Sequence, residues 1–489
     1  MTRWPSLAVL WSAAALLIAA GAWTSVRGDD ARAEELAAPQ VTAPVSVPQG
    51  SLDTPLLVRA RSLLGLLALT GLAWLLSVDR ARVAWRVVAW GLALQIVFAV
   101  FILKTPIGAG IFSTANTVIL ALLGFTVDGA RFLFGNLVFD NVPVGAGTAG
   151  QGGFTPIPGQ IANTGGFFAF NVLPTIIFFS SLMTVLYHLG IMQAAVKGIA
   201  WVMQRTMKTS GAETLSAAGN IFLGQTESPL LVKPFIERMT TSELMCVMAA
   251  GFASVAGGVM AAYVGMLVGY FPDIAGHLMA ASVMSAPAAI VVSKLMWPES
   301  ERPETADTLE IHVEKPDSNV LGAAARGASE GLYLALNVGA MLLAFVALVY
   351  MFNGMIGWAA GLVGFEGLTL EAMLGWLLAP LAWLMGVPWA DAPAIGALIG
   401  VKTVLNEFFA YLQLGGTLAG AHDLDPRSIV IATYALAGFA NFGSVGIQIG
   451  GIGAMAPSRR QDLSRLGLRA MVAGSIATFM TACIAAMIL

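Results

Sequence analysis

The sequence predicts an all-α polytopic membrane protein, and composition and apolar runs both support this prediction. Of the 489 residues, 57% are hydrophobic and only 11% are charged, whereas soluble domains carry about 25% charged residues. The mean hydropathy is +0.79, and apolar runs near the roughly 20 residues that a transmembrane helix needs recur along the chain. These runs lack the alternation of a transmembrane barrel. We therefore expect about eight core transmembrane helices.

The remaining composition argues against an enzyme and against a nucleic-acid-binding protein. The net charge is −3, and there is no basic patch. Cys246 and Cys483 lie in apolar runs, and the four histidines are scattered without the spacing of metal ligands. No Ser/His/Asp set, catalytic Cys/His pair or phosphate-binding lysine loop is evident. Two glutamates could perform acid–base hydrolysis, but no metal site or nucleophile accompanies them.

Residues 1–33 are interpreted as either a signal peptide or an uncleaved anchor helix, with equal weight. The apolar run from Leu7 to Ala22 is short, and Ala31-Arg32-Ala33 resembles a cleavage site. Either interpretation sends the Pro-, Val- and Ala-rich linker of residues 34–55 to the outer side of the membrane. We expect that linker to be unstructured.

Loop charge orients the region that follows. Arg80, Arg82 and Arg86 lie in a short loop after the first span, and positively charged loops stay in the cytoplasm. The predicted elements are spans over Leu56–Val78 and Val87–Leu103, an interfacial helix over Phe112–Phe125, an outer loop over Val142–Gly166, a span over Phe167–Leu189, and a helix on the cytoplasmic surface over Met192–Met207.

The stretch Gly224-Gln225-Thr226-Glu227-Ser228-Pro229 organises the chain. It lies between two apolar pieces, Ala217–Leu223 and Leu230–Ile236, which are too short to cross a bilayer. Non-helical backbone and a charge persist at membrane depth only when protein buries them or a wet cavity surrounds them. Charged residues follow the second piece, which predicts a re-entrant hairpin over about 211–236 that enters and leaves on the cytoplasmic side. A cytoplasmic loop between two ordinary helices is the alternative.

A similar pattern recurs later in the chain. The intervening elements are spans over Leu244–Tyr270 and Ala275–Leu295, a charged cytoplasmic interval over Glu299–Asp317, an amphipathic piece over Ala323–Leu336, a span over Asn337–Phe352, and outer segments over Leu362–Val387. Asn406-Glu407 then interrupts a short apolar segment, which predicts a second re-entrant hairpin over about 391–416. Spans over Ser428–Ile449 and Gly467–Leu489 follow, with a positive loop between them.

Each hairpin is followed by a span that contains a break. The first break is Ala253-Ser254-Val255-Ala256-Gly257-Gly258-Val259, and the second is Phe439-Ala440-Asn441-Phe442-Gly443-Ser444-Val445-Gly446. All the arginine- and lysine-bearing loops fall in the cytoplasm under one topology, in which the two hairpins enter from opposite faces. This is the signature of an inverted repeat with a binding site between its halves at the membrane midplane.

Glu227 and Glu407 are the first candidates for binding. A carboxylate at membrane depth needs a partner or a ligand; the alternative is a structural ion pair with Lys233 or Lys402. The neighbouring amides and hydroxyls of Gln225, Thr226, Asn441 and Ser444 suit a polar, uncharged ligand with several hydroxyls and ring nitrogens. An anionic ligand would favour arginine or lysine, which the breaks lack.

A second group of oxygen donors suits a small cation. Asn220, Ser254 and the carbonyls near Leu223 and Val255 provide oxygens at helix breaks, which is typical of Na⁺ sites. Ser254 taken alone is better explained as a small packing residue. Phe439 and Val259 offer apolar walls for a flat ring, although a membrane aromatic more often only packs.

The residues at the breaks resemble the concentrative nucleoside transporter family. The resemblance rests on the Gly224–Pro229 stretch, on Asn406-Glu407-Phe408-Phe409-Ala410-Tyr411 and on Gly438-Phe439-Ala440-Asn441-Phe442-Gly443-Ser444, in this order and spacing, and it covers residues 56–489. It implies a homotrimer. Each protomer would pair a scaffold domain with a mobile transport domain built from the hairpins and their following helices.

The resemblance also implies residue roles by motif position. Gln225, Thr226 and Glu227 would hydrogen-bond the nucleobase, and Glu407, Asn441 and Ser444 would hold the ribose hydroxyls. Val259 and Phe439 would pack near the base. Asn220 and Ser254, with the carbonyls of Leu223 and Val255, would bind Na⁺. Serine at 228 and glycine at 443 occupy positions where members vary, and they leave the base preference open.

The implied division of the chain has five parts after the linker. They are a scaffold region over 56–190, a first transport half with hairpin 1 over 191–298, a cytoplasmic loop over 299–320, a scaffold helix with interfacial segments over 321–388, and a second transport half with hairpin 2 over 389–489.

We therefore expect a sodium-coupled nucleoside symporter of the plasma (inner) membrane, working by an elevator-type mechanism. Its partners would be the nucleoside, Na⁺ and lipid, with no cofactor beyond the coupling ion. The alternatives are a proton-coupled symporter, because some members use H⁺, and a membrane protein that binds nucleosides without moving them.

Overall fold

The computed structural model describes residues 54–139, 141–146, 155–163, 168–306, 317–362, 364, 367–419 and 424–489. The prediction for residues 1–33 and nearly all of the predicted linker lie outside these ranges. Most of the cytoplasmic interval after Ala306 does so as well.

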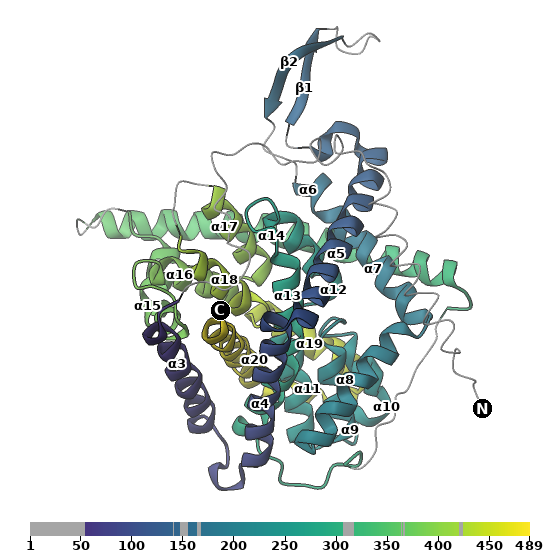
Figure 1. The fold of residues 1–489 in the computed structure, drawn as a ribbon, viewed down its shortest axis with the longest axis vertical. Helices are drawn as coiled ribbons and strands as arrows, with labels where there is room; N and C mark the ends of the chain where they lie inside the picture. Colours follow the sequence, from purple (N-terminus) through teal and green to yellow (C-terminus); the bar gives the residue numbers. More distant parts are fainter. Residues whose placement is uncertain are drawn as a thin grey trace.

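The described chain is almost entirely helical (Figure 1). The helices are α3 (Leu56–Leu75), α4 (Trp85–Lys104), α5 (Pro106–Phe134), α6 (Phe168–Asn171), α7 (Leu173–His188), α8 (Ile191–Met207), α9 (Gly211–Gly219), α10 (Lys233–Ile236), α11 (Thr241–Ala253), α12 (Gly257–Leu267), α13 (Ile274–Met296), α14 (Val320–Gly361), α15 (Leu370–Met385), α16 (Ala392–Val404), α17 (Glu407–Ala419), α18 (Pro426–Leu436), α19 (Phe442–Met455) and α20 (Arg460–Ile488). Short 3₁₀ helices add η1 (Arg80–Arg82), η2 (Gly135–Val138), η3 (Ser228–Val232) and η4 (Pro457–Arg459).

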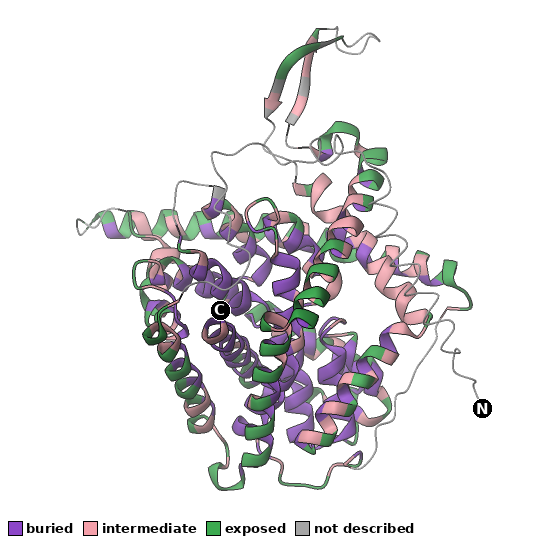
Figure 2. Ribbon diagram, in the orientation of Figure 1, coloured by how far each residue is buried: buried purple, intermediate pink, exposed green. Residues whose placement is uncertain are grey.

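The length and hydropathy of these helices confirm a multi-pass membrane protein. In the described part of the chain, eight helical segments are long and apolar enough to cross a membrane. They include α3, α4, α13, α14 and α20, and the α11–α12 pair counts as one of them. Buried residues concentrate in α11, α13, α18 and α20, whereas α3 and α4 expose large apolar side chains (Figure 2). This distribution is expected of a protein whose outer surface meets lipid.

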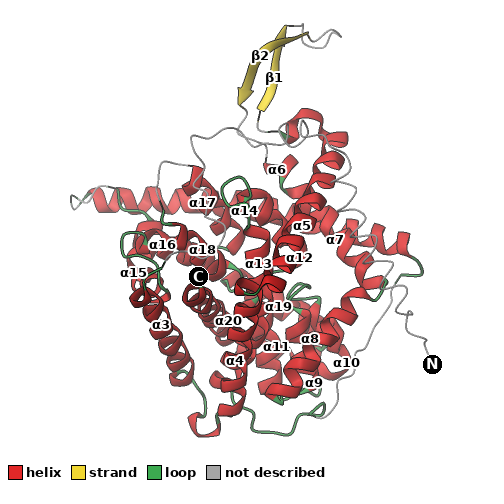
Figure 3. Cartoon of the chain, in the orientation of Figure 1, coloured by secondary structure: helices red, strands yellow, loops and turns green. Residues whose placement is uncertain are grey.

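Three elements differ from the sequence prediction. The segment expected as an interfacial helix over 112–125 lies within the 29-residue α5. The pieces expected over 323–336 and 337–352 form one continuous helix of 42 residues, α14, in which Gly327 and Gly331 let the helix approach the backbone of α7 closely. The expected outer loop contains an antiparallel ribbon of β1 (Asn141–Ala146) and β2 (Thr155–Asn163), which projects from the helical body (Figure 3).

Both predicted hairpins and both breaks are present. Hairpin 1 consists of α9, a turn, η3 and α10, and hairpin 2 consists of α16 and α17. The first broken span is α11 followed by α12, and the second is α18 followed by α19. The order of elements is the same in the two halves, as an inverted repeat requires.

A buried cluster of polar side chains fixes the start of hairpin 1. Ser210 and Glu213 form a capping box on α9, and the Ser210 hydroxyl also donates to the Glu243 carboxylate on α11. The Lys294 ammonium on α13 lies 2.7 Å from the Glu213 carboxylate. These contacts join three elements of the first half into one unit.

We expect Ser210→Ala to lower the free energy of unfolding by about 1–2 kcal/mol, because the substitution removes the N-cap of α9. Thermal unfolding of the purified protein checks this. Ser329→Ala is the control, since that exposed hydroxyl only bonds back to the Ala325 carbonyl within α14. Equal melting temperatures for the two variants would contradict the expectation.

Candidate functional site

The two broken spans meet at their breaks. The Phe439 N–H donates to the Ser254 carbonyl at 3.3 Å. Gly438 allows this approach, because a Cβ there would lie 2.7 Å from the Phe252 carbonyl oxygen. An N–H in the unwound backbone of one half therefore provides a hydrogen bond to a carbonyl in the unwound backbone of the other.

The turn of hairpin 1 lies against the first break. The Gly257 N–H donates to the Phe222 carbonyl at 3.1 Å, and the Ser282 hydroxyl on α13 donates to the Ile221 carbonyl at 2.6 Å. The Gly224 N–H donates to the Glu227 carboxylate at 3.2 Å. Glu227 is an exposed residue by its total surface, and its carboxylate has acceptor positions beyond this one that a ligand can use.

Glu407 starts α17 of hairpin 2 and is only 4% exposed. Two groups from other elements hold its carboxylate. The Tyr263 hydroxyl on α12 donates at 2.9 Å to one oxygen, and the Asn441 amide donates at 3.0 Å to the other. Asn441 is in turn fixed as the N-cap of α19, because its side-chain oxygen accepts from the Ser444 N–H at 2.8 Å. The carboxylate is therefore oriented before any ligand binds.

A chain of hydrogen bonds joins the two hairpins. The Gln225 amide donates to the Ser444 hydroxyl at 3.2 Å, which connects hairpin 1 through Ser444 and Asn441 to Glu407. Gln448 supports this chain by donating to the Gln225 side-chain oxygen and to the Met248 carbonyl, each at 3.1 Å. The structure thus brings together residues of both halves that the sequence predicted as one site.

The predicted cation donors also lie at adjoining breaks. The side-chain oxygen of Asn220, a residue that is 1% exposed, has no hydrogen-bond donor among the described residues. Its amide nitrogen donates to the Ser216 carbonyl, which directs the free oxygen the other way. Ser254 donates to the Ala250 carbonyl and keeps its lone pairs available. Among the described residues, no backbone N–H outside the helices donates to the carbonyls of Leu223 and Val255. A buried oxygen without a donor is costly, so this set fits a small cation.

Apolar and aromatic residues complete the surroundings. Val259 and Phe439 are both buried. Tyr263 stacks on Tyr411 with ring centroids 4.3 Å apart, and Phe408 meets Tyr263 edge to face. This packing holds the Tyr263 hydroxyl against Glu407. Thr226 is half-buried beside Gly451 of α19, where a Cβ would meet its side chain at 2.6 Å.

The sequence predictions omitted Gln448 and Tyr263. Each lies four residues after a predicted site residue on the same helix, Gln448 after Ser444 and Tyr263 after Val259. Residues four apart share a helix face, so this spacing is the signal that could have found them. The alternative ion pair of Glu407 with Lys402 is not formed: the Lys402 ammonium donates instead to the Ala435 carbonyl and the Thr478 hydroxyl.

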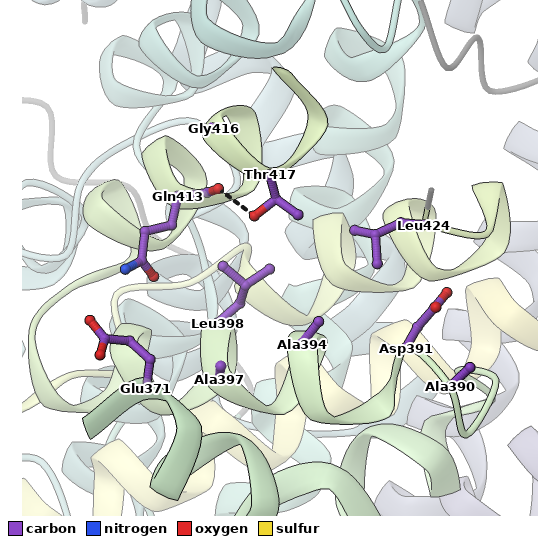
Figure 4. Close-up of a pocket in the computed structure, with 10 residues that line it drawn as sticks. All are labelled: Glu371, Ala390, Asp391, Ala394, Ala397, Leu398, Gln413, Gly416, Thr417 and Leu424. Carbon is purple, nitrogen blue, oxygen red and sulfur yellow. Dashed lines mark hydrogen bonds between the residues drawn. The ribbon is translucent and has the colours of Figure 1, made fainter. Parts of the chain in front are cut away.

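A separate cavity of about 620 Å³ lies along hairpin 2 and α15 (Figure 4). Asp391 and Glu371 lie toward its opposite ends, and none of the predicted site residues lines it. Asp391 accepts hydrogen bonds from the Ser428 hydroxyl and from the Asp425 N–H. These bonds give its carboxylate a structural role at the start of α18. This cavity is therefore distinct from the candidate site.

We expect Tyr263→Phe to raise the KM for a nucleoside about 10-fold or more, because one hydrogen bond to a carboxylate is lost, and such bonds are worth about 1.5 kcal/mol or more. Radiolabelled uptake checks this. Tyr411→Phe is the matched control, since its hydroxyl donates to the Thr433 backbone, away from Glu407. An unchanged KM in the Tyr263 variant would remove that residue from the site.

In the described part of the chain, eight membrane-length helical segments, two hairpins and a polar site at paired helix breaks define a helical membrane carrier. Family profiles match most of the chain: "Na+ dependent nucleoside transporter N-terminus" over residues 64–137, "Nucleoside recognition" over 169–269, and "Na+ dependent nucleoside transporter C-terminus" over 277–486. The chain belongs to the concentrative nucleoside transporter family.

Individual relatives agree with this assignment. Solute carrier family 28 member 3 of Mus musculus is 41% identical over 450 residues, which cover 89% of this chain and 60% of the mouse protein. An uncharacterized transporter of Haemophilus influenzae is 43% identical over 427 residues, 87% of this chain and 96% of that protein. The chain thus spans about 60% of the length of the mouse relative and nearly all of the bacterial one.

A solved structure shares the fold. CNTnw in an inward-facing substrate-bound state has a TM-score of 0.78 and 43% sequence identity, covering 88% of this chain and 98% of the other. An outward-facing variant of CNTnw has a TM-score of 0.79 with the same identity. The relative is therefore seen in two transport states with the same overall architecture.

Proposed function

We propose that the protein is a sodium-coupled symporter that carries nucleosides into the cell across the plasma (inner) membrane. The observation that carries this proposal is the hydrogen-bonded chain from Gln225 through Ser444 and Asn441 to Glu407. It gathers neutral donors and acceptors with the Glu407 carboxylate, and no guanidinium takes part in it. Such a set suits a neutral ligand rich in hydroxyls and ring nitrogens.

The two ends of this chain would bind different parts of the nucleoside. Glu407 is oriented from two sides and can accept hydrogen bonds from a pair of ribose hydroxyls, with Asn441 and Ser444 beside it. Gln225, Thr226 and Glu227 on hairpin 1 can meet the donor and acceptor edges of the base. Val259 and Phe439 would pack on the flat ring.

Sodium would bind among the side-chain oxygens of Asn220 and Ser254 and the carbonyls of Leu223 and Val255. These oxygens belong to the turn of hairpin 1 and to the first break, so bound Na⁺ would hold the turn in the form that presents Gln225. The nucleoside must then raise the affinity for Na⁺ by the factor by which Na⁺ raises the affinity for nucleoside.

Movement would follow the division of the chain into scaffold and transport parts. The transport part would comprise residues 191–298 and 389–489, and the scaffold would comprise 56–190 and 321–388. An apolar cavity of about 220 Å³ separates α5 and α7 from α12 and α13, and Ser282 supplies its only polar lining side chain. An apolar boundary of this kind offers few polar contacts that would hold the two parts together, and we propose an elevator-type mechanism in a homotrimer.

The decisive experiment is uptake of radiolabelled uridine and adenosine into proteoliposomes, with and without an inward Na⁺ gradient at constant pH. The proposal expects uptake above equilibrium only with the Na⁺ gradient. Uptake driven by a pH gradient and indifferent to Na⁺ would move the coupling to a carboxylate. Binding without counterflow would reduce the protein to a nucleoside-binding membrane protein.

A further inference from the structure

Hairpin 2 contains a buried cation that the proposed site does not use. Lys402 on α16 is 1% exposed, and its ammonium donates to the Ala435 carbonyl at 2.8 Å and to the Thr478 hydroxyl at 3.3 Å. It also lies 5.7 Å from the centroid of the Phe479 ring. Within the described residues, no carboxylate forms an ion pair with it. Neutral oxygens and an aromatic face therefore surround this side-chain nitrogen.

The position of this ammonium relative to helix ends explains how the charge is tolerated. Ala435 lies in the last turn of α18, and Lys402 lies in the last turn of α16. The final carbonyls of a helix lack intrahelical donors and carry partial negative charge. The ammonium therefore supplies one of the donors that the end of α18 lacks.

The first half of the repeat has the same arrangement of a hairpin helix, a broken-span helix and a hydroxyl from the next long helix. There, α9 ends at Gly219 and α11 ends at Ala253, and a hydroxyl of the next long helix, Ser282 of α13, binds the hairpin turn. In the second half the corresponding elements are α16, α18 and α20, with Thr478 as the hydroxyl. The first half presents the unpartnered Asn220 oxygen at this point, and the second half presents an ammonium.

We propose that the Lys402 ammonium is a built-in cation of the second repeat, which takes the place that a bound Na⁺ takes in the first. This inference rests on the proposed sodium coupling at hairpin 1. A tethered cation links α16 to the end of α18 and to α20 in every state, loaded or empty. Hairpin 2 thus keeps its shape without an ion from solution, and Na⁺ is carried at hairpin 1 alone.

The charge carried per cycle follows from this arrangement. The lysine charge moves with hairpin 2 in both directions and cancels, so only the Na⁺ at hairpin 1 contributes to the net charge. Lys402→Asn removes the charge and shortens the side chain, so that the new amide oxygen, the Ala435 carbonyl and the Thr478 hydroxyl border the space that the ammonium leaves. That oxygen set resembles the one around Asn220, and it should recruit a second Na⁺ from solution.

The test measures the net charge moved per nucleoside from the voltage at which uptake into proteoliposomes stops. We expect about one charge for the parent protein and about two for Lys402→Asn, with the Hill coefficient for Na⁺ rising from near one to near two. Lys402→Met, which offers neither charge nor oxygen, is the matched control and should lose uptake without a second Na⁺. Thr478→Val added to Lys402→Asn should abolish the second Na⁺.

A readout independent of transport is the melting temperature as a function of Na⁺. Lys402→Asn should be stabilised more steeply by Na⁺ than the parent, and Lys402→Met should not. An unchanged Hill coefficient and charge ratio in a folded Lys402→Asn protein would overturn the inference. If that variant does not fold, two charges per nucleoside in the parent would overturn it equally. A parent protein indifferent to Na⁺ is a different result, because it contradicts the proposed function itself.

Discussion

Glu407→Gln is expected to lower the kcat/KM of nucleoside uptake by about 100-fold or more. The carboxylate is buried and already accepts from Tyr263 and Asn441. An amide in its place has one acceptor oxygen and one donor nitrogen, so a donor would face either the Tyr263 hydroxyl or the Asn441 amide. Hydrogen bonds to charged groups contribute about 1.5–3 kcal/mol each, and the loss of two such contacts to ribose hydroxyls accounts for this factor.

The measurement for Glu407→Gln is radiolabelled uridine uptake at fixed Na⁺, with protein content and melting temperature determined in parallel. Glu371→Gln is the control, because Glu371 lies by the separate outer cavity and accepts from Asn353. A folded Glu407→Gln protein with normal uptake would contradict the assignment of the ribose contact. A 2′-deoxynucleoside gives a second check, since replacing Glu407 should lower its uptake by a smaller factor than it lowers the uptake of uridine.

Much of the site could be predicted from the sequence because membrane composition makes polar groups conspicuous. Glu227 and Glu407 interrupt apolar segments too short to cross a bilayer, and burying a charge there is costly without a function. Both carboxylates lie where hairpins turn, as predicted. The first span breaks within the predicted residues, and the second breaks between Leu436 and Phe442, which overlaps the start of the predicted break. The positions of helix breaks and of the polar residues beside them can therefore be predicted from the sequence.

Features that depend on packing between distant segments cannot be predicted from the sequence in this way. The continuous length of α14 follows from Gly327 and Gly331, which fit against α7 and leave no reason for a boundary near residue 336. The β1–β2 ribbon depends on the pairing of two uncharged strands, Asn141–Ala146 and Thr155–Asn163, neither of which shows clear alternation. An ion pair of Glu407 with Lys402 is the alternative to a binding role that the sequence leaves open. The structure instead directs the Lys402 ammonium to α18 and α20.

Asn220→Ala is expected to raise the Na⁺ concentration for half-maximal uptake by about 10- to 100-fold. Its side-chain oxygen is buried and has no donor among the described residues, so it is available to a cation. Losing one oxygen from a desolvated cation should cost about as much as losing one hydrogen bond to a charged group, roughly 1.5–3 kcal/mol, and each 1.4 kcal/mol corresponds to about a factor of ten. By linkage, the KM for nucleoside at low Na⁺ should rise as well, and saturating Na⁺ should restore it.

Sodium titrations of uptake at several uridine concentrations distinguish this coupling from general damage. Asn116→Ala is the matched control, because the Asn116 amide donates to the Pro272 carbonyl far from the breaks. A structural defect at Asn220 would lower uptake at every Na⁺ concentration, whereas loss of a cation ligand moves the curve along the Na⁺ axis and leaves its plateau. A variant whose Na⁺ curve coincides with that of the parent would remove Asn220 from the cation site, and sodium coupling would then need other oxygens than those at hairpin 1.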